Sequence, residues 1–228
     1  MILGTDLIPL FLSLRLAITA SIIGFFIGLP VSWLLGSSQG KWVEALDSLL
    51  TLPMVLPPTV LGYYLLLVLG RNSVVGRLAE NLGFPLVFTT RGAVIAALIV
   101  SLPFFIKTSR SAIESVPSNL LDAARMLGRN EFEVFWEIVI PNAWQGIASG
   151  FVLMFARALG DFGTTLMVAG SIPGQTLTMP IAIYNAMLAG ERSTANILVA
   201  IMTGTAFLIL LLLNGLNRHL GRRGRKDA

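Results

Sequence analysis

Long apolar stretches, separated by short segments that carry most of the charge, dominate the pattern of residues along this chain. A helix of about 20 apolar residues is long enough to cross the hydrocarbon core of a bilayer, and helices satisfy their own backbone hydrogen bonds there. The pattern therefore predicts an all-α membrane protein, with one domain over residues 1–228 and five transmembrane helices. We place these spans at residues 7–35, 49–70, 92–113, 144–169 and 194–217.

Composition supports this interpretation and excludes several kinds of site. Of the 228 residues, 55% are hydrophobic and 12% are charged, whereas soluble domains carry about 25% charged residues. The chain has no cysteine, which excludes disulfides and thiolate metal sites. The single His219 has no neighbouring ligand for a metal. The first ten residues lack a positive segment, so we expect the first span to be an uncleaved anchor.

Basic residues gather on one side of the predicted spans. Of the sixteen Lys and Arg residues, ten fall on the side of the loop 117–143 and the tail 218–228, and four fall on the opposite side. The positive-inside rule then places the loop and the tail in the cytoplasm and the N-terminus outside. The tail could also contact anionic membrane lipid. The basic charge is thus topological, and we expect no nucleic-acid partner.

The loop 117–143 has local signals for two short helices. Ser118 is a candidate N-cap of the first helix, and Gly128 fits the position after its last turn. Asn130 followed by Glu133 resembles a capping box for the second helix. Pro141 is expected to end that helix, because proline disrupts continued hydrogen bonding.

The second of these helices is predicted to be amphipathic. Its apolar positions follow the spacing of one helix face, and its acidic positions lie opposite. The apolar residues are Phe132, Phe135, Trp136 and Val139, and the acidic ones are Glu131, Glu133 and Glu137. Such a helix could lie on the membrane surface, but surface helices usually carry basic residues on the polar face. An acidic flank favours docking into a groove of another protein.

The same loop resembles the EAA loop of the membrane subunits of ABC importers. That signature reads E-A-A, three residues, G, nine residues, I, any residue, L-P, and its spacing is intact here with Asp for Glu and Ile for Leu. The matching positions are Asp122, Ala123, Ala124, Gly128, Ile138, Ile140 and Pro141. The resemblance implies that the loop docks on a cytoplasmic ATPase, which binds ATP and Mg. The chain itself has no G-x-x-x-x-G-K-[ST] sequence, so we expect no enzyme activity and no cofactor in it.

Two further stretches are similar to molybdate-type permeases, at residues 52–67 and 155–187. The resemblance implies the type I ABC-importer permease fold and a homodimer with a pathway at its interface. It also implies an extracytoplasmic oxyanion-binding protein, ATP-driven alternating access, and a location in a bacterial or archaeal inner membrane. A sulfate, thiosulfate or tungstate permease is the alternative within transport. An ATP-independent transporter or channel, and a membrane scaffold, are the alternatives from other classes.

Two groups of residues are candidates for the pathway or its gate. Pro57 and Pro58 remove backbone donors in the second span, either as an ordinary helix start or as a distortion that serves gating. Arg157 and Asp161 lie four apart in the fourth span, as an intrahelical ion pair or as a pathway element that attracts an oxyanion. Gly160 and Gly163 would permit a bend or close packing beside them.

Three other features of the spans lead to structural predictions. Arg15, near the start of the first span, is expected to extend toward the headgroups. The patterns Gly24-x-x-x-Gly28 and Gly146-x-x-x-Gly150 predict close helix packing, within the subunit or between subunits. The apolar run near residues 181–188 is too short to cross a membrane and predicts an interfacial or re-entrant helix.

Overall fold

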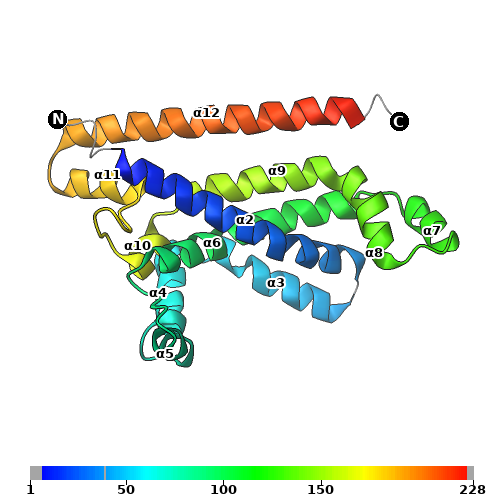
Figure 1. The fold of residues 1–228 in the computed structure, drawn as a ribbon, viewed down its shortest axis with the longest axis horizontal. Coiled ribbons are helices and arrows are strands. Elements are labelled where there is room, and N and C mark those ends of the chain that lie inside the picture. The colour runs from blue at the N-terminus through cyan, green and yellow to red at the C-terminus, as the bar shows by residue number, and fades with distance from the viewer. Residues whose placement is uncertain (1–6, 39, 225–228) are drawn as a thin grey trace.

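The computed structural model describes residues 7–38 and 40–224, and their regular structure is entirely helical. In chain order the helices are α2 (Ile8–Ser37), α3 (Lys41–Val55), α4 (Pro58–Leu69), α5 (Val74–Asn81), α6 (Thr90–Glu114), α7 (Ser118–Met126), α8 (Glu131–Val134), the π-helical turn η1 (Phe135–Val139), α9 (Ile140–Leu159), α10 (Gly163–Ala169), α11 (Met179–Leu188) and α12 (Arg192–Gly224). Below, the α7 end is the end of the bundle that carries α7 and α8, and the α5 end is the opposite one (Figure 1).

Helices α2, α6 and α9 form the core, with α6 packed along both of the others (Figure 1). Small side chains line much of this contact, and Ala17, Ala20 and Ala97 are almost fully buried. Because lipid supplies no hydrophobic force between spans, close approach of the backbones is what stabilises such a bundle. Larger side chains fill the core nearer the α7 end, where Phe105 and Met154 are fully buried.

The glycine patterns predicted from the sequence serve packing within the subunit. A Cβ atom added to Gly24 would lie 2.6 Å from Met154 Sδ, and one added to Gly28 would lie 2.6 Å from Phe105 Cδ1. A Cβ atom added to Gly146 would likewise overlap with the Cβ of Ala112. Larger residues at these positions would push α2 and α9 away from the core.

Two of the five predicted spans are broken. Four helical segments are long and apolar enough to cross a membrane within the described residues, and the bent pair α3–α4 would bring the number to five. This pair turns by 115° between Val55 and Pro58, so residues 49–70 are not one straight helix. Pro57 is the N-cap of α4 and Pro58 its first residue, where a missing N–H costs nothing. The predicted fourth span is also interrupted, between Leu159 and Gly163.

The remaining helices lie at the margins of the core. Helix α12 runs along one side of the molecule (Figure 1), and only 6% of the residues in its most apolar 18-residue stretch are buried. It continues beyond the predicted span through Gly224. The tail side chains from 216 onward lie outside the description, as do residues 225–228. The predicted short outer helix is α11, whose Met179 and Ile181 are fully buried. It is therefore packed against the bundle through part of its surface.

Candidate functional site

The turn after α7 is closed by a complete set of backbone hydrogen bonds. Gly128 has a positive φ of 81°, a conformation that glycine adopts without strain. Its N–H donates to the carbonyl of Arg125, and the N–H of Arg129 donates to that of Ala124, which is the Schellman pattern. The prediction for Gly128 is confirmed. The prediction for Ser118 is wrong, since it is the first helical residue and Pro117 occupies the cap.

The predicted capping box of the second helix is present. Asn130 Oδ1 accepts from the N–H of Glu133 at 2.9 Å, and Glu133 Oε2 accepts from the N–H of Asn130 at 2.9 Å. Each bond satisfies a backbone donor that the helix start would otherwise leave unpaired. The loop therefore has a fixed geometry between its two helices.

Pro141 does not end the second helix, contrary to the prediction. Residues Glu131–Leu159 run on through α8, η1 and α9. The π-helical turn carries the chain past the proline, because the N–H of Ile140 donates to the carbonyl of Phe135, five residues back. Pro141 then lies in the first turn of α9, where its missing donor is tolerated.

The predicted apolar stripe is divided between the core and the surface. Val139 is fully buried, and the ring of Phe135 packs against Trp33 with 5.3 Å between centroids. Phe132 and Trp136 remain 72% and 50% exposed. Two apolar residues at the end of α7 are also exposed, Met126 at 89% and Leu127 at 84%. We call Met126, Leu127, Phe132 and Trp136 the loop patch; Met126 is a member that the sequence pattern did not identify.

The signature residues have different surroundings. Ala124 is buried, and Ile138 and Ile140 pack against the core cluster. The others are exposed: Asp122, Ala123, Gly128 and Pro141. The first group holds the loop on the bundle, and the second group remains accessible.

Ion pairs tie α7 to α8. Arg125 donates from Nε and Nη2 to the two carboxylate oxygens of Glu131, at 2.8 and 3.2 Å, and from Nη1 to Asp122 at 3.3 Å. The hydrogen bond from Arg125 holds the pKa of the Glu131 carboxyl below its ordinary value, and it raises the pKa of Arg125. Both side chains are largely exposed, so the pair contributes less than about 1 kcal/mol. Its main effect is to orient the two helices.

The second candidate site lies at the interruption between α9 and α10. The side chain of Asp161 is only 1% exposed. Its Oδ2 accepts from the N–H of Thr165 at 2.9 Å and from the Thr165 hydroxyl at 2.7 Å, while its Oδ1 accepts from Arg157 Nη1 at 3.3 Å. The expected intrahelical ion pair is present. Asp161 also joins the end of α9 to the first turn of α10 through Thr165. The spacing of Arg157 and Asp161 gives no signal for this second role.

The interruption packs directly against the bend before α4. A Cβ atom added to Gly163 would lie 3.0 Å from Pro58 Cβ, and one added to Gly62 would lie 2.6 Å from Met167 Cβ. The hydroxyl of Thr164 donates to the carbonyl of Pro58 at 3.3 Å. The structure thus brings Pro58 and Gly163 together from distant parts of the sequence. Pro57 and Gly160 are exposed, and Gly160 only ends α9.

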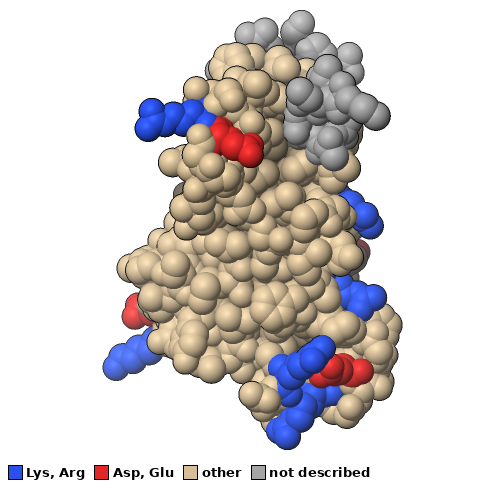
Figure 2. All heavy atoms as spheres, turned by 90° about the vertical axis from the view of Figure 1, so that its left-hand side faces the viewer, with Lys and Arg blue, Asp and Glu red and all other residues tan. Residues whose placement is uncertain are grey.

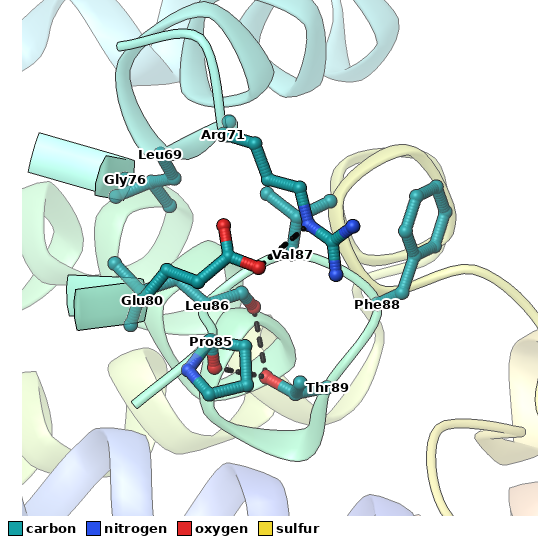
Figure 3. A pocket seen from close by; sticks show the side chains of 10 residues that line it. Leu69, Arg71, Gly76, Glu80, Pro85, Leu86, Val87, Phe88 and Thr89 are labelled. Atoms are coloured by element: carbon teal, nitrogen blue, oxygen red, sulfur yellow. Dashed lines mark hydrogen bonds and ion pairs between the residues drawn. The ribbon is translucent and has the colours of Figure 1, made fainter. Parts of the chain in front are cut away.

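A pocket of about 530 Å³ opens at the α5 end, between the end of α4 and the start of α6 (Figure 3). Its two charged side chains face each other, with Arg71 Nε 3.1 Å from Glu80 Oε1. The Thr89 hydroxyl donates to the carbonyl of Leu86 at 2.8 Å. The N–H of Phe88 donates to the carbonyl of Val168 at the end of α10. The pocket's polar groups are therefore paired with one another, and this segment fastens α6 to α10.

The chain is similar to known membrane transport proteins over nearly its whole length. Residues 28–226 match the family described as "Binding-protein-dependent transport system inner membrane component". The chain is 40% identical over 209 residues to the molybdenum transport system permease protein ModB of Escherichia coli strain K12, covering 91% of each chain.

Two solved structures are similar in fold at 16% sequence identity. One is the inward-facing MetNI methionine ABC transporter, with a TM-score of 0.74 over 92% of this chain and 94% of that one. The other is a bacterial alginate ABC transporter in complex with its pentasaccharide-bound periplasmic protein, with a TM-score of 0.77 over 95% and 80%. The predicted type I importer-permease fold is confirmed.

Proposed function

Because the chain belongs to the family of binding-protein-dependent transport system inner membrane components, we propose that it is the permease subunit of an ATP-driven molybdate importer. Its place as a multi-pass protein of the inner membrane follows from the family and from its apolar helices. The substrate proposal rests on the 40% identity to a molybdenum permease over 91% of the chain. The observation that carries the mechanism is the exposed loop patch, held on a helix that continues into the core.

The loop patch is proposed to dock on a separate ABC ATPase. Water-exposed Met126, Leu127 and Phe132 form a surface that gains from burial in a protein cleft. The Gly128 turn and the capping box fix the shape of this surface before docking. ATP and Mg belong to the partner, and this chain contributes neither a cofactor nor covalent chemistry. The loop and the tail are then cytoplasmic, and the N-terminus is outside.

Movement of the loop reaches the second candidate site through α9. Glu131–Leu159 is one continuous helical segment. Asp161 joins its end to α10, and α10 in turn contacts α4 where Gly163 meets Pro58. We therefore assign the α4–α10 crossing to the gate. Alternating access follows from docking-driven movement of this crossing in a homodimer whose pathway lies between the two copies.

Arg157 is the pathway residue that attracts the oxyanion in this scheme. Its side chain is 28% exposed, and its charge is balanced by Asp161. A balanced guanidinium attracts an anion weakly, which suits a conduit from which the substrate must leave. Specificity then comes from an extracytoplasmic oxyanion-binding protein that docks at the α5 end.

Uptake of labelled molybdate into proteoliposomes tests this function. The vesicles would contain this subunit, the ATPase and the binding protein encoded beside it. We expect uptake that requires ATP and resists excess sulfate, with tungstate as an effective competitor. Equal competition by sulfate would assign the chain to sulfate transport, and uptake without ATP would refute the importer.

A further inference from the structure

A cleft at the α5 end, separate from both candidate sites, contains two arginines from different helices. Its volume is about 300 Å³, far more than the space of one water molecule. The residues that line it are Arg15, Leu16 and Thr19 of α2 and Thr90, Arg91 and Val94 of α6. We call this the arginine cleft. Figure 2 views the molecule from this end and shows a mostly uncharged face with charged side chains toward its edges.

The two guanidinium groups of the arginine cleft have no acidic partner among the described residues. Neither Arg15 nor Arg91 lies within ion-pair distance of a described carboxylate, and no acidic side chain lines the cleft. Arg71 and Arg157 have such partners, in Glu80 and Asp161, whereas Arg77 and Arg192 at this end also lack an ion pair within the described part of the chain. Two positive charges that have no acidic partner within residues 7–38 and 40–224 raise the potential of the cleft and attract anions.

The hydrogen-bond donors of the cleft restrict the chemical class of its ligand. The hydroxyl of Thr19 already donates to the carbonyl of Arg15 at 2.7 Å, and that of Thr90 donates to the carbonyl of Gln175 at 3.1 Å. The carbon Cζ of Arg91 lies 4.6 Å from the centre of the Phe84 ring, which orients the group by a cation–π contact. The donors left for a ligand are guanidinium N–H groups, and these bind carboxylate and phosphate-like oxyanions in pairs.

The position of Arg15 along α2 also indicates a polar ligand. It lies about two turns into α2, a helix that is long and apolar enough to cross a membrane. A charged residue at such a position is costly unless it faces water, a partner charge or a polar ligand. The predicted extension of Arg15 toward the headgroups is compatible with this position, and the structure adds Arg91 beside the same opening.

We propose that the arginine cleft binds a tetrahedral oxyanion through Arg15 and Arg91. Two sources share this chemistry: a free oxyanion from solution and the phosphate of an anionic lipid. The inference does not depend on the molybdate proposal, since it rests on the charge and donors of this cleft alone.

Two binding measurements on the full chain distinguish these sources. The first is equilibrium binding of labelled molybdate and of labelled inorganic phosphate to protein in a phosphate-free detergent. The second is native mass spectrometry of phosphatidylglycerol retained by the same preparation. We expect Arg15→Gln and Arg91→Gln each to weaken retention of the bound species by about tenfold or more, as removal of a charge-assisted hydrogen bond does. If the variants bind less labelled molybdate or phosphate than the wild type, the ligand is a free anion. If they retain less phosphatidylglycerol, the ligand is a lipid.

Matched variants distinguish binding at the arginine cleft from a general effect of removing positive charge. Arg77→Gln removes an exposed arginine of α5 that lies at the same end but outside the cleft, and we expect it to bind like the wild type. Arg15→Lys and Arg91→Lys keep the charge and are expected to retain part of the binding. No retention of any probe by the wild type would overturn the proposal, and so would equal loss in Arg77→Gln. Folding of each variant is checked by its unfolding midpoint.

Discussion

The carboxylate of Asp161 accepts hydrogen bonds from both the backbone N–H and the hydroxyl of Thr165, and it thereby joins α9 to α10 across the interruption of the fourth span. We expect Asp161→Ala to lower the free energy of unfolding by about 1–3 kcal/mol, because a backbone donor and Arg157 lose their partner. Unfolding in mixed detergent micelles, followed by tryptophan fluorescence, measures this change.

Thr165→Val is the matched control for that prediction. It removes the hydroxyl bond and keeps the backbone bond, so its effect should be smaller than that of Asp161→Ala. An Asp161→Ala protein as stable as the wild type would show that the bridge contributes nothing to the junction of α9 and α10.

The crossing of α4 and α10 depends on Gly62. In Gly62→Ala the added methyl group would lie 2.6 Å from Met167 Cβ, an atom close to the backbone of α10. Overpacking of this kind costs about 1–3 kcal/mol, and we expect lower stability together with slower transport. Gly204→Ala in α12 is the control, since an added Cβ there meets nothing within 4 Å. Equal effects of the two variants would argue against a tight crossing.

The loop patch is tested by acidic substitutions. We expect Phe132→Asp and Leu127→Asp to leave membrane insertion intact and to reduce co-purification of the partner ATPase by at least about tenfold, since burying an unpaired charge in an interface is costly. Leu82→Asp, at a position 73% exposed at the α5 end, is the control. If it impairs co-purification as strongly, docking does not occur at the loop.

The turn at Gly128 gives a second test of docking. Proline is locked near φ −65°, whereas Gly128 has a φ of +81°. Gly128→Pro should therefore disrupt the Schellman turn and displace Met126 and Leu127, with loss of ATPase binding measured by the same co-purification. ATPase recovery at the wild-type level would contradict the proposal that this turn shapes the docking surface.

Protonation of Glu131 should loosen the connection between α7 and α8. Its pKa is lower in the folded protein than its ordinary value of 4.5. The stability it contributes is therefore fully present above that value and is lost as the pH falls through the folded pKa. We expect Glu131→Gln to increase hydrogen exchange of residues 118–134 at pH 7, with little difference from the wild type at a pH below the folded pKa of Glu131. Glu44→Gln, outside the loop, should change nothing at either pH, and identical exchange of Glu131→Gln and wild type at pH 7 would refute the role of the pair.

Several features set by neighbouring residues were predictable from the sequence, whereas most features set by contacts between distant residues were not. The capping box of Asn130 and Glu133 involves positions three apart, so its spacing alone identified it. The prediction that Pro141 ends the helix is wrong because a π-helical turn, which has no clear sequence signal, carries the helix past it. The division of the apolar stripe between Val139 and Phe132 depends on which face meets the core. The Arg15–Arg91 cleft joins positions far apart along the chain, which no local pattern could reveal.

The unbroken helical segment from Glu131 to Leu159 has a mechanical consequence. Its longest part is α9, whose 20 residues span about 30 Å at 1.5 Å per residue, whereas the α8 part turns away from this direction (Figure 1). If α9 pivots at its Ile140 end, a tilt of about 5° displaces its far end by about 3 Å over that length, comparable to the diameter of a water molecule. In the proposed mechanism α9 is then a lever arm, moved by the ATPase at the loop and connected to the α4–α10 crossing at its far end. Tilts of a few degrees would be enough to open or close a passage for a small anion.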